Sequence, residues 1–412
     1  MAENGVEAVL EQLVFSLKSS LHLLTADKTR AHLDATLHND AKLPEKRIAA
    51  MASETIDLLH QVEQLLEPAH LVLADHFLGY TNTKCLCAAV ELRIPDILAT
   101  GALDLNALAL ASKARPDRLG QIMRPLYNNG IFSFDAINEK FSNNRTSILL
   151  QSDHWTGWAN WVDLYGNEFY DIARGIPASI KQNAVRSGAQ INFDTDENMF
   201  AYFQAQGWVP RLHKTLGAGA TAMAPGILQD YPWEEVADRT ILDIGGGGGA
   251  LVASLLQEHK EMKGGIFELA SVVEHAKSFF SHGGQYAYLS PRVPVENLIA
   301  GDFFESIPSF EVYVMKWVLH DWEDPDALRI LQNIRRAIIL GPKSRLVVLE
   351  SILASGRMGR LSRYGDINMM MTAKGHERTE AQWRGLVEKA GWRVTGIYPM
   401  RNAWVQAIEL KV

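Results

Sequence analysis

The sequence lacks the features that typify secreted, membrane-spanning or nucleic-acid-binding proteins. Its 412 residues include two cysteines, Cys85 and Cys87, which lie too close together to build a disulfide framework. No stretch approaches the roughly 18 consecutive apolar residues of a membrane-spanning helix. The formal net charge is −8, which is unfavourable for binding nucleic acid or an anionic membrane. We therefore expect neither nucleic acid nor a membrane as a partner.

A secretion signal is also missing from the first residues. They include Glu3 and Glu7 and show no basic stretch followed by an apolar one. We therefore expect a cytoplasmic protein, in which the thiols stay reduced. Without secretion, the glycosylation sequon Asn144-Arg145-Thr146 is interpreted as a chance match.

The composition is that of a globular protein, with 47% hydrophobic and 21% charged residues, and the length predicts two or three domains. Residues 6–24 and 47–78 have apolar side chains at helical spacing, and a linker over 39–45 separates them. Because these helices are apolar on one side, packing or self-association is the preferred interpretation of this region.

Residues 83–148 have the pattern of a winged helix. Three helices are expected over 83–92, 104–112 and 116–127, followed by a hairpin of 131–134 and 136–141. The region holds eight Lys or Arg and six Asp or Glu, a surplus too small for a phosphate-binding surface. We therefore favour a dimerisation or substrate-lid module over DNA binding.

Aromatic residues are dense between 155 and 210. Two interpretations stay open, namely an ordinary core and the wall of a pocket for a flat, largely apolar ligand. The residues concerned are Trp155, Trp158, Trp161, Tyr165, Phe169, Tyr170, Phe193, Phe200, Tyr202, Phe203 and Trp208.

From Thr240 onward, strand and helix patterns alternate. Strands are expected over 240–244, 265–268, 312–315 and 345–349, with a helix over 251–259. This alternation predicts a doubly wound α/β fold, which binds ligands beyond the carboxyl ends of its strands.

The strongest ligand-binding pattern is the glycine loop that follows Asp243. Residues 245–249 are all glycine, so the main chain can turn tightly and a ligand can lie against it. Glu268 ends the next strand, where a carboxylate can accept both hydroxyls of a ribose. Asp302 and Phe303 can bind and stack on an adenine ring, although a turn-forming role for Asp302 is the alternative. Three acidic groups at one edge favour the cationic S-adenosylmethionine over a dinucleotide.

A second cluster of reactive residues surrounds His320. This histidine follows the strand over 312–315, and Asp324 with Pro325 predicts a helix start just after it, with Asp324 as the N-cap. Glu350 ends a further strand. Glu377 precedes a helix that begins with a Thr379/Gln382 capping box. Carboxylates beside an imidazole fix its tautomer and stabilise its protonated form.

Three segments together resemble a known family. Residues 242–247, 316–322 and Gly375-His376-Glu377-Arg378-Thr379, with Ala390-Gly391-Trp392, are similar to the plant caffeate-type and fungal small-molecule O-methyltransferases. The resemblance is specific over 227–412 and looser over 70–226. It implies a Rossmann-like methyltransferase sheet at the C-terminus, an N-terminal, mainly α, winged-helix-like dimerisation domain, and a homodimer. The expected divisions are 1–165 for the helical extension and dimerisation domain, 166–226 for pocket-lining helices, and 227–412 for the catalytic domain.

The resemblance also implies roles for single residues. His320 is the expected general base, which Glu350 and Glu377 orient and Asp321 supports, without a metal ion. Trp161, Phe203, Met370 and Trp317 are expected to line a pocket for an aromatic or polyketide-like substrate. S-adenosylmethionine is expected to contact Asp243, Gly245, Gly247, Glu268, Asp302, Phe303 and Lys316.

Two functions remain in competition. The first is O-methylation of a phenol or enol of a specialised metabolite. The second is a pericyclase or dehydratase that keeps S-adenosylmethionine as an electrostatic or structural cofactor, since Lys316 and a fixed sulfonium can polarise a carbonyl. The second is motivated by residues 203–210, which depart from the Met-bearing sequence common in the family.

Overall fold

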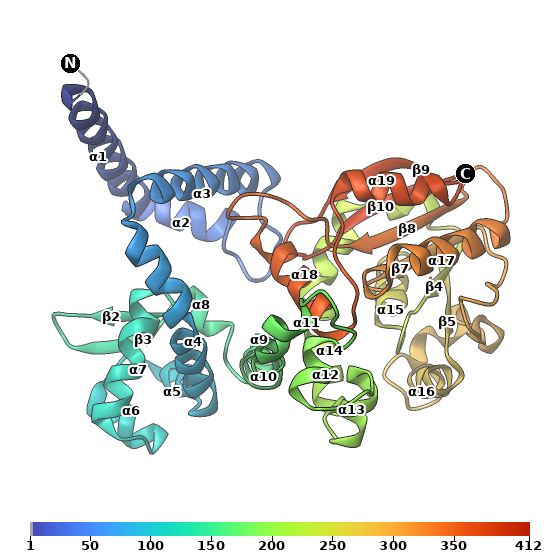
Figure 1. Cartoon of the computed structure of the whole chain (residues 1–412), viewed down its shortest axis with the longest axis horizontal. Helices are drawn as coiled ribbons and strands as arrows, with labels where there is room; N and C mark the ends of the chain where they lie inside the picture. The colour runs from blue at the N-terminus through green and yellow to red at the C-terminus, as the bar shows by residue number, and fades with distance from the viewer. Residues whose placement is uncertain (1–2) are drawn as a thin grey trace. The chain divides into compact units, whose positions relative to one another are not determined.

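The computed structural model describes residues 3–412 and divides into two compact units, Met1–Leu59 and His60–Val412. The first two residues, which belong to the predicted extension over 1–165, lie outside the described part. Figure 1 labels the elements along the chain. No helix between residues 3 and 412 is long and apolar enough to cross a membrane.

The N-terminal segment is helical, as the apolar spacing predicted, but the predicted helix over 47–78 is wrong in one respect. The chain breaks at Pro68, which lacks the N–H that a continuous helix would use, and a new helix begins at Ala69. The predicted helix over 83–92 is the end of this new helix. The bounds are α1 (Glu3–Thr25), α2 (Asp27–Thr36), α3 (Lys46–Leu66) and α4 (Ala69–Glu91).

The winged-helix pattern over 83–148 is confirmed, but the second strand of the hairpin lies at 140–143 and not at the predicted 136–141, because residues 136–139 form the turn. The side chain of Asp104 caps α6 by accepting from the backbone N–H groups of Asn106 and Ala107. Asn144, interpreted above as a chance sequon, caps the short helix α8 through a capping box with Ser147. A three-stranded sheet has the order β1-β3-β2. The elements are α5 (Ile94–Ile97), β1 (Leu103–Asp104), α6 (Leu105–Ser112), α7 (Pro116–Asn128), β2 (Phe132–Asp135), β3 (Lys140–Asn143) and α8 (Arg145–Ile148).

Helices connect this region to the large sheet. One of them is a single π-helical turn, Tyr165–Phe169, an unusual geometry that is frequent at functional sites. The helices are α9 (Trp158–Leu164), α10 (Tyr170–Ile172), α11 (Ile176–Ser179), α12 (Gly188–Asn192), α13 (Met199–Ala205) and α14 (Val209–Asp230).

The large sheet has seven strands in the order β6-β5-β4-β7-β8-β10-β9, parallel except for pairings that involve β10. This confirms the doubly wound α/β architecture. Its strands are β4 (Thr240–Ile244), β5 (Lys263–Glu268), β6 (Leu298–Ala300), β7 (Val312–Lys316), β8 (Arg345–Glu350), β9 (Arg393–Pro399) and β10 (Gln406–Lys411).

Helices cover both faces of this sheet, as Figure 1 shows. Helices α14, α15 (Ala250–Glu258) and α16 (Ala270–Phe280) pack on one face, against Val312, Val314 and Val347 among others. Helices α17 (Asp324–Ala337) and α19 (Glu380–Lys389) pack on the other face, against Tyr313 and Leu346 among others. Helix α18 (Arg360–Thr372) lies between β8 and α19 in the chain. Because both faces are buried, the central strands are apolar almost throughout.

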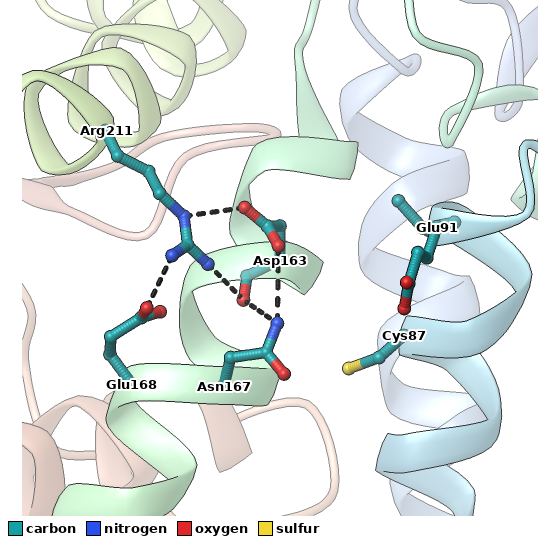
Figure 2. A pocket seen from close by; sticks show the side chains of 7 residues that line it. Cys87, Glu91, Asp163, Asn167, Glu168 and Arg211 are labelled. Carbon is teal, nitrogen blue, oxygen red and sulfur yellow. Dashed lines mark hydrogen bonds and ion pairs between the residues drawn. The ribbon is translucent and has the colours of Figure 1, made fainter. Parts of the chain in front are cut away.

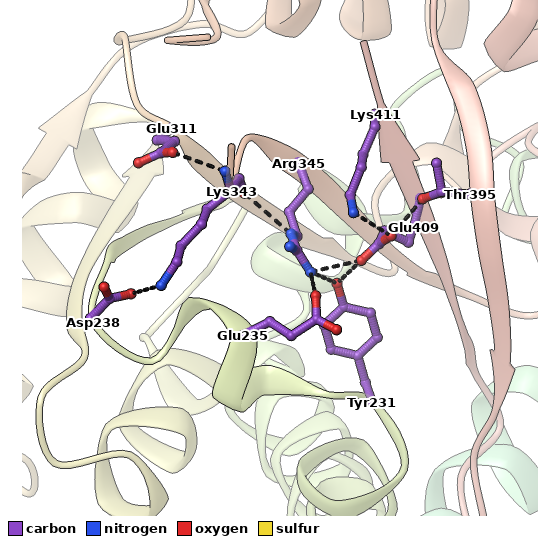
Figure 3. Close-up of polar contacts among 9 residues, drawn as sticks. All are labelled: Tyr231, Glu235, Asp238, Glu311, Lys343, Arg345, Thr395, Glu409 and Lys411. Atoms are coloured by element: carbon purple, nitrogen blue, oxygen red, sulfur yellow. Dashed lines mark hydrogen bonds and ion pairs between the residues drawn. The ribbon is translucent and has the colours of Figure 1, made fainter. Parts of the chain in front are cut away.

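A buried ionic network lies at the start of β8. The Nη1 of Arg345 lies 2.8 Å from Glu409 Oε2 and 2.8 Å from Glu235 Oε2, and Tyr231 donates its hydroxyl to Glu409 (Figure 3). Burial alone would raise the pKa of Glu409, but hydrogen bonds from Thr395 and Tyr231 and the charge of Arg345 hold this pKa below its usual value. The network joins β8 to β10 and to the loop before β4.

We expect Arg345→Met to destabilise the fold by about 3–5 kcal/mol, because the buried carboxylate of Glu409 would lose its nearest cation and keep Lys411, at 3.3 Å, as the remaining one. Urea unfolding followed by tryptophan fluorescence measures this loss. Lys343→Met is the matched control, since the partly exposed pair of Lys343 with Asp238 contributes at most about 1 kcal/mol. Equal losses in the two variants would contradict a special role for the buried network.

Candidate active site

His320 lies at the carboxyl edge of the sheet, where sequence analysis expected it. It follows β7 in a short turn of 3-10 helix, Leu319–Asp321, and its side chain is buried. Its Nδ1 atom is 2.9 Å from Glu377 Oε1 and 3.5 Å from Glu350 Oε2. The structure therefore brings the predicted histidine and both predicted glutamates together.

The two glutamates are held by different backbone contacts. Oε1 of Glu350 accepts the backbone N–H groups of Val318 and Leu319, at 2.9 and 2.8 Å. The backbone N–H of Glu377 donates to Asp366 in α18. Glu350 thus fixes the turn that carries His320, and Glu377 holds the imidazole itself. Sequence analysis did not single out Asp366, because an aspartate within a helix carries no distinctive signal.

The tautomer of His320 follows from these contacts. When Nδ1–H donates to Glu377, Nε2 keeps its lone pair and can accept a proton. Asp321 Oδ1 lies 3.7 Å from Nε2, which is too far for a hydrogen bond. The arrangement can therefore take up a proton at Nε2 and stabilise the resulting charge from the Nδ1 side.

The buried carboxylates dominate the electrostatics of the cluster. Burial opposes the charge of the imidazole, but Glu350 and the hydrogen bond to Glu377 outweigh burial and raise the pKa of His320 to about 9. Burial also raises the pKa of Glu350. In the described part of the chain, Oε2 of each glutamate has no hydrogen-bond donor.

The same three side chains also meet a spacing found in metal sites. His320, Glu350 and Glu377 each offer one donor atom, and these atoms lie within 4.8 Å of one another. Sequence analysis predicted no metal ion, and that stays a prediction. Two of these side chains, His320 and Glu377, are already joined by a hydrogen bond of 2.9 Å.

Two neighbours that sequence analysis missed hold the turn of His320 in place. The guanidinium of Arg378 is buried and donates to the carbonyl oxygens of Leu319 and Trp322, on either side of the histidine. At Gly375, a Cβ atom would lie 1.9 Å from the carbonyl oxygen of His320, so a side chain does not fit there. The Gly-His-Glu-Arg-Thr segment was the available signal, but sequence analysis assigned roles in it to Glu377 and Thr379 alone.

Arg378 also explains why the predicted N-cap of α17 is wrong. Sequence analysis expected Asp324 to be the N-cap of α17. The N-cap is instead Glu323, without a side-chain capping bond, and Asp324 is the first helical residue. Its carboxylate pairs with Arg378 at 2.9 Å, so the ion pair replaces the capping interaction.

The glycine loop connects β4 to α15, as predicted. Gly245, Gly247 and Gly249 have positive φ angles, which glycine adopts at little cost. A Cβ at Gly245 would lie 2.7 Å from Val318, whereas a Cβ at Gly247 would meet nothing within 4 Å. The loop therefore turns tightly and leaves open space along its backbone. Glu268 accepts the backbone N–H groups of Gly247 and Leu269.

Asp243 and Lys316 connect the glycine loop to the His320 cluster. They lie at the ends of the neighbouring strands β4 and β7. Burial raises the pKa of Asp243 to about 7, and Lys316 opposes this rise. Burial lowers the pKa of Lys316, while the charges of Asp243 and Glu350 oppose this lowering. Along this edge of the sheet, an acidic residue of β4, the lysine of β7 and the glutamate of β8 therefore follow one another with alternating charge.

The remaining predicted cofactor residues follow β6. Oδ1 of Asp302 accepts the backbone N–H of Phe304, which is the turn-forming role named above as the alternative. The ring of Phe303 packs against Phe304 and Trp322. Both residues lie beyond the strand next to β5, and their contact with a cofactor stays a prediction.

The four predicted pocket residues have different environments. The ring of Trp317 is nearly parallel to that of His320, with centroids 6.5 Å apart, and its backbone is left-handed, which is uncommon for a bulky residue. Trp161 is buried and contacts Tyr165 and Trp404. Phe203 is fully buried in the helical core, and Met370 is partly exposed on α18.

A separate cavity of about 480 Å³ lies between α4 and the helices that follow residue 158. Figure 2 shows Arg211 paired with Asp163 and Glu168 on one wall, and Cys87 and Glu91 of α4 on the other. None of the predicted site residues lines this cavity.

Comparison with known proteins agrees with this geometry. A family model described as the O-methyltransferase domain matches residues 215–393, and one for the O-methyltransferase dimerisation domain matches residues 74–153. O-methyltransferase aclM of Aspergillus oryzae is 58% identical over 99% of this chain and 95% of its own length. O-methyltransferase verK of Clonostachys rogersoniana is 46% identical over 98% of this chain and 100% of its own length.

Solved structures give the same fold. The mitomycin 7-O-methyltransferase MmcR has a TM-score of 0.67 and 26% identity, over 83% of this chain and 97% of that chain. The calicheamicin-biosynthesis methyltransferase CalO1 has a TM-score of 0.72 at 23% identity, over 83% of this chain and 97% of that one.

We expect His320 to titrate near pH 9 in NMR spectra of protein with labelled histidine. Glu377→Gln should move this titration to lower pH, because the imidazolium loses a charged acceptor. Glu380→Gln, which changes an exposed glutamate at the start of α19, is the control and should leave the titration unchanged. An unchanged pKa in Glu377→Gln would show that the carboxylate does not hold the imidazole.

Proposed function

This chain belongs to the S-adenosylmethionine-dependent O-methyltransferase family, and we propose that it methylates a phenol or enol hydroxyl of a small specialised metabolite with His320 as the general base. The observation that carries the proposal is the hydrogen bond from His320 Nδ1 to Glu377, which leaves Nε2 as the basic nitrogen. In our proposal Glu350 and Glu377 orient the base, and Asp321 supports it.

The residues around the glycine loop fit the cofactor. The open space at Gly247 admits a ligand against the backbone, and the carboxylates of Asp243 and Glu268 suit a nucleoside that carries a positive charge. When bound, S-adenosylmethionine supplies an electrophilic methyl group. We assign its binding to Asp243, Gly245, Gly247, Glu268, Asp302, Phe303 and Lys316.

The chemistry assigned to His320 is proton removal as the substrate oxygen reacts. A phenol has a pKa near 10, so at neutral pH it needs a base during the reaction. With a pKa of about 9, the imidazole is neutral in roughly one molecule in a hundred at pH 7, and alkaline pH favours this reactive form. General-base assistance of this kind contributes about 10²–10⁴-fold.

The substrate and partners are proposed from weaker support. We place an aromatic or polyketide-like substrate beside Trp317, with Trp161, Phe203 and Met370 in the pocket wall. Trp317 has the strongest support, because its ring lies parallel to that of His320. The dimerisation domain suggests a homodimer. We propose a cytoplasmic location, no nucleic-acid or membrane partner, no metal ion, and domain divisions at residues 165 and 226.

The alternative of cofactor-dependent cyclisation is not favoured, because the curated relatives are named O-methyltransferases. The mass of the product separates the two reactions. Methyl transfer adds the mass of one CH₂ group and yields S-adenosylhomocysteine. Pericyclic ring formation leaves the mass unchanged, dehydration lowers it by one H₂O, and neither consumes the cofactor.

We expect His320→Ala to lose about 10²–10⁴-fold in the rate of label transfer from S-[methyl-³H]adenosylmethionine, because the substrate hydroxyl loses the general base that we assign to it. Candidate substrates are aromatic polyketides and alkaloids. His282→Ala, which changes an exposed histidine, is the matched control. Transfer by His320→Ala at the control rate would remove His320 from the mechanism.

We expect Glu268→Gln to weaken cofactor binding about 10- to 100-fold in titration calorimetry, because the ribose hydroxyls lose a charged acceptor. Glu296→Gln is the control, since Glu296 is an exposed glutamate in the same region of the chain. Thermal unfolding of both variants checks that the glycine loop, which Glu268 also supports, stays folded. Unchanged affinity in a folded Glu268→Gln protein would contradict the assignment.

A further inference from the structure

His320, Glu350 and Glu377 form a group of potential metal ligands, although in the proposed function they act without a metal ion. It is the one group of this kind that the described part of the chain brings together. The three residues are buried, with exposed fractions of 7%, 0% and 3%. Hydrogen bonds hold the carboxylate of Glu350 and the backbone of Glu377 in place. The ligands are therefore positioned before any ion arrives.

The spacing of the ligand atoms fits a tetrahedral zinc ion. Zinc binds imidazole nitrogen and carboxylate oxygen at about 2.0–2.2 Å, so two ligands of a tetrahedron lie about 3.3 Å apart. Nδ1 of His320 lies 2.9 Å from Glu377 Oε1 and 3.5 Å from Glu350 Oε2, one distance on each side of this value. Small rotations of the carboxylates therefore bring all three atoms to bonding distance of one ion.

Two carboxylate oxygens of the group are without a hydrogen-bond donor. Among the described residues, no hydrogen bond reaches Oε2 of Glu350 or Oε2 of Glu377. A buried carboxylate oxygen without a donor costs free energy, and a cation is a partner that removes this cost. Glu350 can bind an ion through this oxygen and keep both backbone hydrogen bonds at its other oxygen.

The charges around the group favour a divalent ion. Two carboxylates outweigh one imidazolium, whereas they balance one divalent ion beside a neutral imidazole. The guanidinium of Arg378 already pairs with Asp324, and Lys316 is shared between Asp243 and Glu350. A divalent ion therefore leaves the buried group closer to electrical neutrality than a proton does.

The kind and number of ligands select zinc over magnesium and calcium. Magnesium and calcium prefer oxygen ligands, and magnesium keeps several waters while calcium takes about six to eight ligands. This group offers one imidazole and two carboxylates in a buried place. Zinc accepts three protein ligands of these types and leaves its fourth position to water.

We propose that this group binds Zn²⁺ through Nδ1 of His320 and one oxygen each of Glu350 and Glu377, and that the bound ion inhibits the proposed methyl transfer. The inference rests on His320 as the general base and adds a regulation of that same site. Zinc is an inhibitor here and not a cofactor, so catalysis without a metal ion stays as proposed above.

Inhibition follows from the two nitrogens of the imidazole. Without zinc, Nδ1 carries a hydrogen toward Glu377, and Nε2 is the nitrogen that accepts the substrate proton. The Nδ1–Zn bond uses the Nδ1 lone pair, so Nδ1 gives up its proton. This proton leaves to the solvent from an imidazolium, or passes through the solvent to Nε2 from a neutral ring. The neutral ring then carries its hydrogen on Nε2, and no lone pair remains for the substrate hydroxyl.

The first test locates the ion. The full-length protein is freed of metal with a chelator and titrated with Co²⁺, whose visible absorption reports a tetrahedral site, and Zn²⁺ then displaces the Co²⁺. We expect Glu377→Gln to weaken Zn²⁺ binding at least about tenfold, because the ion loses a charged ligand. Glu380→Gln, at an exposed glutamate, is the matched control and should bind Zn²⁺ as the wild type does. Equal affinities in the two variants, or a wild type that binds no Zn²⁺, would overturn the proposal.

X-ray absorption by the zinc-loaded wild type decides the matter even if Glu377→Gln folds poorly. We expect one imidazole, with the remaining ligands oxygen, at about 2.0–2.2 Å. Sulfur at about 2.3 Å would place the ion at Cys85 or Cys87, and several imidazoles would place it at other histidines. Either result contradicts the proposed site.

The third test measures the consequence for the reaction. Saturating Zn²⁺ should slow methyl transfer about 10²–10⁴-fold, as loss of the base would, while calorimetry gives an unchanged affinity for the cofactor. Mg²⁺ at the same concentration is the control and should leave the rate unchanged. In spectra of protein with ¹⁵N-labelled histidine, zinc should leave Nε2 of His320 as the one nitrogen with a hydrogen. Full activity of the zinc-saturated wild type, or zinc bound at Nε2, would show that the proposal is wrong.

The binding and NMR measurements need no substrate, which keeps this proposal separate from the proposed function. A wild type that binds Zn²⁺ at this group without transferring methyl groups in its metal-free form would contradict the function and support the zinc site. An active wild type that binds no Zn²⁺ would do the opposite.

Discussion

The hydrogen bond between His320 and Glu377 is the interaction on which the site depends. It fixes the ring of a buried imidazole, leaves Nε2, on the side away from the two glutamates, as the basic nitrogen, and supplies negative charge where positive charge develops. Glu350 acts indirectly, because its carboxylate accepts hydrogen bonds from the backbone of the turn that carries His320. The other contacts around the turn, from Arg378 and at Gly375, preserve this one geometry.

Charge of alternating sign links the two halves of the site. Asp243 is the last residue but one of β4, and Lys316 and Glu350 end β7 and β8, so their order in space is set by the order β4-β7-β8 in the sheet. Lys316 offsets a carboxylate on each side, which allows acidic groups for a cationic ligand and acidic groups for an imidazole to coexist in a buried edge. Loss of this one cation would leave Asp243 without a positive charge between it and Glu350, whereas Glu350 would still have the imidazolium of His320.

Much of the fold was predictable because its signals are local. An apolar run followed by glycines predicts a strand that ends in a tight turn, as at residues 240–244. A Thr379/Gln382 capping box predicts the start of a helix. The structure confirms both predictions. The limits of the prediction have physical causes. The break at Pro68 divided one apolar pattern into two helices. The capping role of Asp324 failed because Arg378, 54 residues later, takes its carboxylate, and long-range partners of this kind leave no trace in local spacing.

Strand β8 begins at Arg345 and ends at Glu350. This one strand therefore carries the ion pair of Arg345 with Glu409 at one edge of the sheet and the contact of Glu350 with His320 at the other. The two ends share no side-chain partner among the described residues. Substitutions that strengthen the Arg345 end therefore offer a route to heat-tolerant forms for preparative synthesis, in which substrate range and turnover would be inherited unaltered from the parent protein.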